Sequence, residues 1–153
     1  MTRPAEGDPV PPFSMKADDG SLVSNESLAG HRYVLYFYPK DDTPGCTAQA
    51  CSLRDNWEQV TDAGIEVFGV SPDSVRSHVK FREKYDLPYR LLADEGHAVA
   101  DRFGTWIEKT FAGKNYMGTE RTSFLVGEDG QIERVFPRVK PAEHVDLILG
   151  ALV

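Results

Sequence analysis

The most hydrophobic stretch of the chain is the run Tyr33-Val34-Leu35-Tyr36-Phe37-Tyr38. An unbroken aromatic and aliphatic run is typical of a central strand that is buried on both faces of a sheet. Pro39 follows the run and ends the predicted strand, because proline has no backbone N–H to donate. Shorter strands are predicted over residues 65–70 and 91–93.

Two hairpins are predicted, one near each end of the chain. Strands over residues 13–16 and 21–24 flank the turn Asp18-Asp19-Gly20, where glycine supplies the positive φ that such turns need. Strands over residues 123–126 and 132–136 flank the turn Glu128-Asp129-Gly130.

The clearest helical pattern covers residues 44–63. Thr43 is its predicted N-cap, Pro44 occupies the first helical position, and Gly64 ends it. Further helices are predicted over residues 26–29 (short, closed by Gly30), 73–85 (capped by Asp73 or Ser74), 97–103 (ended by Gly104) and 141–152.

The stretch over residues 105–120 shows no clear period, and we expect mostly loop with some extended structure there. Helices that alternate with single buried strands, together with the two hairpins, indicate an α/β fold: a central mixed β-sheet flanked by helices, with an N-terminal β-hairpin. A chain of 153 residues is near the usual size of one compact domain, so we expect residues 1–153 to form a single domain.

Composition and charge exclude several classes of function. The net charge is -7 and no cluster of Lys and Arg is present, which argues against binding to nucleic acid. The first ten residues lack the apolar run of a secretory signal, and no stretch approaches the ~20 apolar residues of a membrane span. We therefore expect a cytoplasmic protein.

The chain has two cysteines, Cys46 and Cys51. In a reducing compartment such a pair is more often catalytic or metal-binding than a structural disulfide. Cys46 lies in the first turn of the helix that follows the most buried strand, at the edge where open α/β sheets usually bind ligands. Free backbone N–H groups and the helix dipole stabilise a thiolate in such a position. Without that context, a cysteine on an apolar stripe is by default an inert core residue.

A stabilised thiolate is only part of what peroxide chemistry requires. Lowering a cysteine pKa from about 8.5 to about 6 increases the thiolate fraction at neutral pH only about thirtyfold, and a less basic thiolate is also a weaker nucleophile. Donors must also point at the oxygen that departs with negative charge. Thr43 lies three residues before Cys46, and Arg121, at the start of the strand over residues 123–126, supplies a permanent positive charge with several donors.

The two cysteines point in different directions on the predicted helix. At ~100° per residue the apolar stripe consists of Cys46, Ala50, Leu53, Trp57 and Val60. Cys51 lies roughly 140° from Cys46; its neighbours on the charged face are Arg54, Asp55, Glu58 and Asp62. An intact helix separates the two Cα atoms by roughly 8.6 Å, whereas a disulfide needs less than about 7 Å. If the two cysteines bond, the first turns of the helix must unwind.

Two alternative functions have to be weighed for this pair of cysteines. A general thiol-disulfide oxidoreductase usually has two residues between its cysteines, and four are present here. The other alternative is a binding or structural domain with a vestigial site.

The histidines and tryptophans carry no separate functional signal. The chain has four histidines, His31, His78, His97 and His144. They lack metal-ligand spacing, so we interpret them as surface or packing groups. We interpret Trp57 and Trp106 as packing residues.

The chain also resembles a known family. Its pattern of Pro, three residues, Thr, two residues and Cys is met by Pro39, Thr43 and Cys46, and Cys51 stands where many members carry a second cysteine. Further similar blocks are Gly69-Val70-Ser71-Pro72-Asp73-Ser74, Ser77-His78-Val79-Lys80-Phe81, Leu87-Pro88, Trp106-Ile107-Glu108-Lys109, Tyr116-Met117-Gly118 and Arg121-Thr122-Ser123-Phe124. From about residue 8 onwards the chain is similar to the bacterioferritin comigratory protein group of peroxiredoxins, also called peroxiredoxin Q.

This resemblance implies a thioredoxin-like fold and a reaction without cofactor or metal. Cys46 would attack hydrogen peroxide or an organic hydroperoxide and become a sulfenic acid. Cys51 would resolve it as an intrachain disulfide, which thioredoxin or a similar dithiol protein would reduce. Thr43 would orient the peroxide, Arg121 would hold the thiolate and the peroxide, and Pro39 would shield the sulfenic acid. The chain lacks the Gly-Gly-Leu-Gly loop and the cysteine-bearing C-terminal extension of typical two-cysteine members, which favours resolution within a monomer.

Overall fold

The strands form one large sheet and one small one. The computed structural model describes residues 2–152. The strands of the large sheet are β1 (Ser14–Ala17), β2 (Leu22–Ser24), β3 (Tyr33–Phe37), β4 (Glu66–Ser71), β5 (Leu91–Ala93), β8 (Thr122–Val126) and β9 (Ile132–Phe136). They lie in the order β2-β1-β5-β4-β3-β8-β9. The pairs β3/β4 and β4/β5 are parallel and the other pairs are antiparallel, which confirms the predicted mixed sheet.

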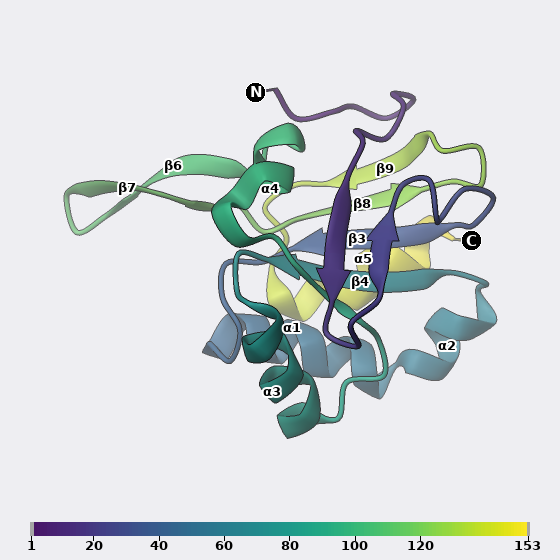
Figure 1. The fold of residues 1–153 in the computed structure, drawn as a ribbon, viewed down its shortest axis with the longest axis horizontal. Helices are drawn as coiled ribbons and strands as arrows, with labels where there is room; N and C mark the ends of the chain where they lie inside the picture. Colours follow the sequence, from purple (N-terminus) through teal and green to yellow (C-terminus); the bar gives the residue numbers. More distant parts are fainter. Residues whose placement is uncertain (1, 153) are drawn as a thin grey trace.

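Helices cover both faces of this sheet (Figure 1). The helices are α1 (Pro44–Asp55), α2 (Trp57–Asp62), α3 (Val75–Tyr85), α4 (Ala98–Arg102) and α5 (His144–Ala151), with short 3-10 turns at Glu95–His97 and Pro141–Glu143. Buried residues of α1, α2, α3 and α5 share one hydrophobic cluster, and α4 belongs to the other. Within residues 2–152, no helix is long and apolar enough to cross a membrane.

β3 supplies side chains to both cores, as its unbroken hydrophobic run predicts. Tyr33, Leu35 and Phe37 belong to the cluster on the α4 face, whereas Val34 and Tyr36 belong to the cluster that contains Cys46. Because successive side chains of a strand alternate between faces, five consecutive apolar residues are needed to fill both cores. The strand therefore places the site-bearing helix α1 against a rigid, fully buried support.

Two predicted helices differ from the structure. The helix predicted over residues 44–63 is divided at Asn56, whose backbone (φ -113°, ψ 19°) is not helical. The Asn56 side chain donates to the carbonyl of Ser52 at 2.8 Å, a local bond that competes with helix continuation. The helix predicted over residues 26–29 is absent; hydrogen-bonded turns replace it, in which the Ser24 and Ser27 hydroxyls accept bonds from each other's backbone N–H.

The prediction of mostly loop over residues 105–120 is wrong. This stretch forms a regular antiparallel hairpin of β6 (Trp106–Phe111) and β7 (Lys114–Thr119), closed by Ala112 and Gly113 with positive φ. It projects from the body of the molecule (Figure 1). Most of its side chains are exposed on both faces, so the hydrophobic alternation that reveals a half-buried strand is missing.

Candidate active site

Cys46 lies where the sequence predicts, in the first turn of α1 beyond the end of β3. Its side chain is buried, with 2% of its surface exposed. The first backbone bond of the helix runs from the Thr47 N–H to the Thr43 carbonyl at 2.8 Å. The N–H groups that precede it lie at the positive end of the helix dipole. The thiol is therefore shielded from bulk water and lies at the N-terminal end of the helix dipole.

Arg121 is the side chain that contacts the sulfur. Its Nη2 lies 3.4 Å from Cys46 Sγ, although the two residues are far apart in sequence. Gly45 makes this approach possible, because a Cβ at that position would lie 3.2 Å from Nη2. The backbone of Arg121 is itself fixed, since its carbonyl accepts a bond from the Val139 N–H at 2.8 Å. The structure thus brings together two residues that sequence reasoning nominated separately.

Gln49 is a site residue that the sequence analysis missed. It is fully buried, and its Oε1 accepts a hydrogen bond of 2.6 Å from Arg121 Nη1. The guanidinium is therefore held between the Gln49 amide and the Cys46 sulfur. Gln49 lies three residues after Cys46, one helical turn along the same face, but the predicted stripe counted only apolar residues. A polar residue inside an apolar stripe is the signal that could have revealed it.

The geometry predicts a measurable effect for Gln49→Leu. Removing the acceptor leaves the guanidinium free to rotate, and a hydrogen bond to a charged group contributes about 1.5 kcal/mol or more. We expect oxidation by hydrogen peroxide, followed in stopped-flow experiments, to slow roughly tenfold. Gln59→Leu, at an exposed position of α2, is the control. An unchanged rate in Gln49→Leu would show that Arg121 needs no support from Gln49.

Thr43 occupies the N-cap position, but it does not cap the helix with its side chain. The predicted N-cap residue is thus confirmed, while its hydroxyl makes no capping bond and donates to the Lys40 carbonyl at 2.9 Å. This bond uses the only hydrogen of the hydroxyl and leaves its lone pairs able to accept one. Pro39 lies half-buried in the same loop, which we define as residues 38–43 and call the catalytic loop.

Cys51 lies in the middle of α1 and is only half-buried. Both cysteines are free thiols, and α1 is helical from Pro44 to Asp55, so the two sulfurs are held apart on one intact helix. Asp55 and Glu58 near Cys51 are exposed, as expected for the charged face. Of the predicted stripe, Cys46, Ala50, Leu53 and Val60 are buried, and Trp57 packs half-buried against the same core.

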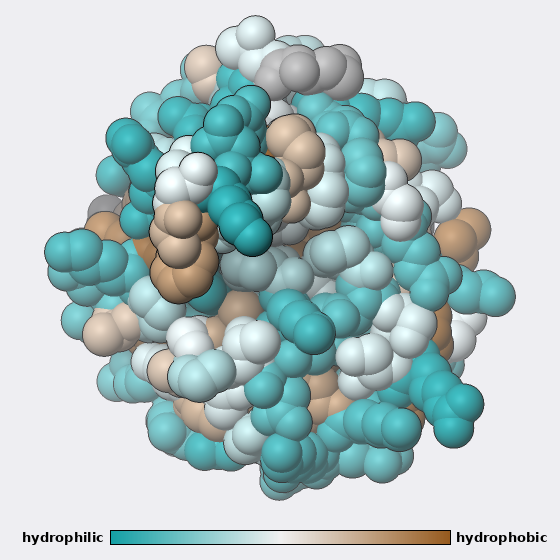
Figure 2. Space-filling view, turned by 90° about the vertical axis from the view of Figure 1, so that its left-hand side faces the viewer, coloured by the Kyte–Doolittle hydropathy of each residue, from teal (hydrophilic) through white to brown (hydrophobic). Residues whose placement is uncertain are grey.

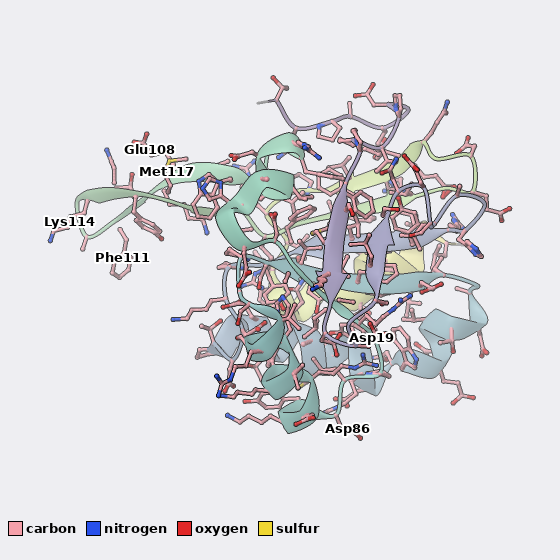
Figure 3. All side chains as sticks on the ribbon, in the orientation of Figure 1. Asp19, Asp86, Glu108, Phe111, Lys114 and Met117 are labelled. Atoms are coloured by element: carbon pink, nitrogen blue, oxygen red, sulfur yellow. The ribbon has the colours of Figure 1, made fainter. Side chains whose placement is uncertain are left out.

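The β6–β7 hairpin flanks the site. Lys109 on β6 is close enough to Arg121 and Cys46 to be influenced by their charges: burial and then Arg121 lower its pKa, and Cys46 acts in the opposite direction. In the hairpin register Lys109 pairs with Tyr116, and Phe111 pairs with Lys114. Phe111 points away from Glu108 and Met117 (Figure 3). Figure 2 shows hydrophobic side chains on this side of the molecule among hydrophilic ones, and Phe111 is 75% exposed.

One group of side chains has the composition of a metal site. Ligand atoms of Asp41, Asp73 and His78 lie within 4.8 Å of one another. Asp41 Oδ2 accepts a bond from the Ser77 hydroxyl and lies 2.7 Å from His78 Nδ1, and Asp73 Oδ2 accepts bonds from the Asp41 N–H and the Ser71 hydroxyl. The acceptor atoms are thus occupied by protein donors, which fits a structural network better than a cation site. His78, interpreted as a surface or packing group, is a fully buried member of this network.

His144 lies behind the site, fully buried at the start of α5. Its Nε2 is 2.7 Å from the Ser123 hydroxyl, and its Nδ1 has no hydrogen-bond partner among residues 2–152. Burial and, secondarily, the Arg121 charge lower the pKa of His144 from 6.5 to about 3. The ring is therefore neutral at physiological pH, and nothing in its surroundings compensates a proton.

This neutral histidine makes the protein sensitive to acid. Below pH 6.5 the unfolded chain binds a proton at His144 that the folded chain does not bind until about pH 3. At about pH 5 we expect the free energy of unfolding to be about 2 kcal/mol lower than at neutral pH through this group alone. Urea denaturation should show that loss in the parent protein and not in His144→Gln. The exposed His31→Gln should keep the parental pH dependence; the same dependence in His144→Gln would contradict the assignment.

The site consists of a buried cysteine at the start of a helix and an arginine guanidinium in contact with its sulfur, beyond the carboxyl end of the central strand β3. This arrangement is typical of a thiol-based redox enzyme. Comparisons with known proteins specify the class further. A model of the AhpC/TSA family matches residues 6–135. The chain therefore belongs to the AhpC/TSA family.

Individual relatives cover almost the whole chain. Peroxiredoxin Bcp of Escherichia coli is 47% identical over 146 residues, which are 95% of this chain and 94% of that protein. A putative peroxiredoxin bcp of Coxiella burnetii is 46% identical over 146 residues, 95% of this chain and 97% of the relative. The solved structure of Xanthomonas campestris peroxiredoxin Q superimposes with a TM-score of 0.86 at 36% identity, covering 92% of this chain and 89% of that one. These relatives place the chain in the Bcp or peroxiredoxin Q group of peroxiredoxins, so it is a thiol-dependent peroxidase, and the expected thioredoxin-like fold is confirmed.

Proposed function

We propose that this peroxidase reduces hydrogen peroxide and organic hydroperoxides with Cys46 as the attacking thiolate and Cys51 as the resolving thiol. The observation that carries the proposal is the contact of 3.4 Å between Arg121 Nη2 and the buried Cys46 Sγ. Attack of the sulfur on the O–O bond forms an S–O bond and releases an alcohol or water. Cys51 then displaces water from the sulfenic acid and forms a disulfide.

The loop and the arginine have separate tasks in the first step. The Thr43 hydroxyl, whose hydrogen is used by Lys40, accepts the hydrogen of the hydroperoxide and orients the O–O bond. Arg121 stabilises the thiolate before attack and the negative charge on the departing oxygen during attack, because its fork offers donors in two directions. Pro39 covers the newly formed sulfenic acid from the loop side.

The second step needs a conformational change. On an intact α1 the two sulfurs cannot bond, because the Cα atoms of residues five positions apart lie roughly 8.6 Å from each other. The first turns of α1 unwind and carry Cys46 out of its pocket towards the half-buried Cys51. The resulting disulfide lies near the charged face, where thioredoxin or a similar dithiol protein reduces it. One chain holds both cysteines, so a monomer in the cytoplasm completes the cycle.

The surroundings of the site support organic substrates as well as hydrogen peroxide. The exposed side chains of Phe111 and Tyr116 lie near Lys109 in the β6–β7 hairpin. The charges of Arg121 and Cys46 influence the pKa of Lys109. These apolar side chains therefore lie on the side of the molecule that carries Cys46. A solved structure of the Xanthomonas campestris bacterioferritin comigratory protein is described by its alkyl peroxide reduction activity.

The proposal is tested by adding one equivalent of hydrogen peroxide to the reduced protein. We expect both thiols to disappear within seconds, with a mass loss of two hydrogens and a peptide map that joins Cys46 to Cys51. An oxidoreductase without peroxidase activity would react only with a disulfide substrate, and a vestigial domain would react with neither. Persistence of both thiols for minutes would contradict the proposed function.

A further inference from the structure

Helix α3 holds Asp41 of the catalytic loop through buried contacts. The Asp41 carboxylate accepts hydrogen bonds from the Ser77 hydroxyl of α3 and from the hydroxyl of Tyr38, the residue that follows β3, and it also contacts His78 of α3. His78 Nε2 lies 2.9 Å from the Leu92 carbonyl, which can only accept, so Nε2 carries a hydrogen. His78 Nδ1 lies 2.7 Å from Asp41 Oδ2. We call this contact of Asp41 with His78 the anchor; its side chains are 4% and 0% exposed.

The same helix holds the next residue, Asp42, from outside. Lys84 Nζ lies 2.7 Å from Asp42 Oδ2, and the Tyr85 hydroxyl donates to Oδ1 at 2.6 Å. The side chains of Lys84 and Asp42 are 58% and 42% exposed. Asp42 has φ 56°, in the left-handed region that non-glycine residues rarely adopt, so these contacts hold a backbone conformation that the free chain disfavours. We call the contacts of Lys84 and Tyr85 with Asp42 the latch.

The anchor and the latch differ in how readily they open. Breaking a buried hydrogen-bonded contact leaves its polar groups without partners in a low dielectric, whereas an exposed pair exchanges its partner for water at little cost. Helix α1 begins directly after Thr43. A conformational change that spreads from its first turn towards the N-terminus therefore displaces Asp42, in the latch, before Asp41, in the anchor. Release of Asp42 also relaxes its left-handed backbone.

We propose that Lys84 and Tyr85 are positioning residues that control disulfide formation: the latch at Asp42 must open for α1 to unwind, while the anchor at Asp41 stays closed. The inference rests on the proposed function, because it assumes the bond between Cys46 and Cys51. With the latch closed, Cys46 stays in its pocket and reacts with peroxide. With the latch open, the sulfenic acid reaches Cys51. The latch therefore sets the competition between disulfide formation and further oxidation of the sulfenic acid to a sulfinic acid by a second peroxide.

Tyr85→Phe removes one hydroxyl of the latch, and Lys84→Gln removes its charge. In both variants we expect the disulfide to form about three- to tenfold faster, as corresponds to the loss of one exposed or charge-assisted contact. The first oxidation by peroxide should keep its parental rate. The fraction of sulfinic acid after excess peroxide, read by intact mass, should fall by a similar factor. Lys80→Gln, an exposed lysine of the same helix, is the matched control.

Amide hydrogen exchange tests the anchor without a substitution. The Asp41 N–H, which donates to Asp73 Oδ2 at 2.8 Å, should stay protected in the disulfide form, whereas the Thr47 N–H should lose its protection. Parental disulfide-formation rates in both latch variants, or loss of Asp41 protection, would overturn the inference. If peroxide forms no bridge between Cys46 and Cys51 at all, the proposed function itself fails and the latch with it. That outcome is distinct, because the disulfide then never appears.

Discussion

Replacing Arg121 with alanine is expected to slow the oxidation of Cys46 by hydrogen peroxide at least about a hundredfold, the usual effect of removing one donor from a developing anion. The guanidinium is the only side-chain donor within residues 2–152 that is bonded to Cys46 Sγ, at 3.4 Å. Without it the thiolate loses its counter-charge and the departing oxygen loses a donor. Single-turnover stopped-flow kinetics measures the rate, and the ultraviolet absorbance of the thiolate measures its population at neutral pH.

Two further variants separate charge from geometry at this position. Arg121→Lys retains the charge but cannot contact Gln49 and Cys46 with one planar fork, so we expect an intermediate rate. Arg76→Ala, at an exposed position of α3, should behave like the parent. If Arg121→Ala reacted at the parental rate, Arg121 would have no part in the chemistry.

Cys51→Ser is expected to separate the two halves of the cycle. The first oxidation should proceed at the parental rate, because Cys51 lies on another face of α1 and does not contact the Cys46 pocket. The sulfenic acid then has no thiol partner in the chain and should persist, detectable by trapping with dimedone and by intact mass. Excess peroxide should convert it to sulfinic acid.

Cys51→Ser is expected to affect steady-state turnover more strongly than the first oxidation. With thioredoxin as reductant we expect the steady-state rate of Cys51→Ser to fall on the order of tenfold or more, since the reductant must reach a buried sulfur instead of a disulfide near the surface. Ser52→Ala, at the neighbouring position of α1, is the control. Full turnover in Cys51→Ser would remove the resolving role from Cys51.

The fold could be predicted from the sequence wherever the spacing of hydrophobic residues indicates which side chains are buried. The run from Tyr33 to Phe37 is buried on both faces because it lies in the centre of the sheet, and its composition shows this directly. The β6–β7 hairpin could not be predicted in the same way, since its stability comes from pairing with itself and leaves no trace in hydrophobic spacing. The end of α1 at Asn56 depends on one side-chain bond to Ser52, which competes with an otherwise helical sequence.

Site residues could be predicted where the residue type suits the chemistry and the position lies at the start of a predicted helix or strand. Cys46 and Thr43 could be inferred from the start of a helix after a buried strand, and Arg121 from its residue type and place before β8. The contact of Arg121 with Gln49 could not be predicted, because the role of a glutamine on an apolar stripe cannot be inferred until its hydrogen-bond partner is known. The contact of Asp41 with His78 is likewise formed by tertiary packing between segments that are distant in sequence.

The break at Asn56 confines the proposed motion to one segment of the chain. Hydrogen bonds within α1 end at this residue, and α2 begins with its own N-terminus at Trp57. When the first turns of α1 open, no continuous ladder carries the opening into α2, whose Val60 stays in the core. In the proposed cycle a local unit therefore melts rather than the domain, so we expect the enzyme to repeat the transition many times without exposing the rest of its core to aggregation.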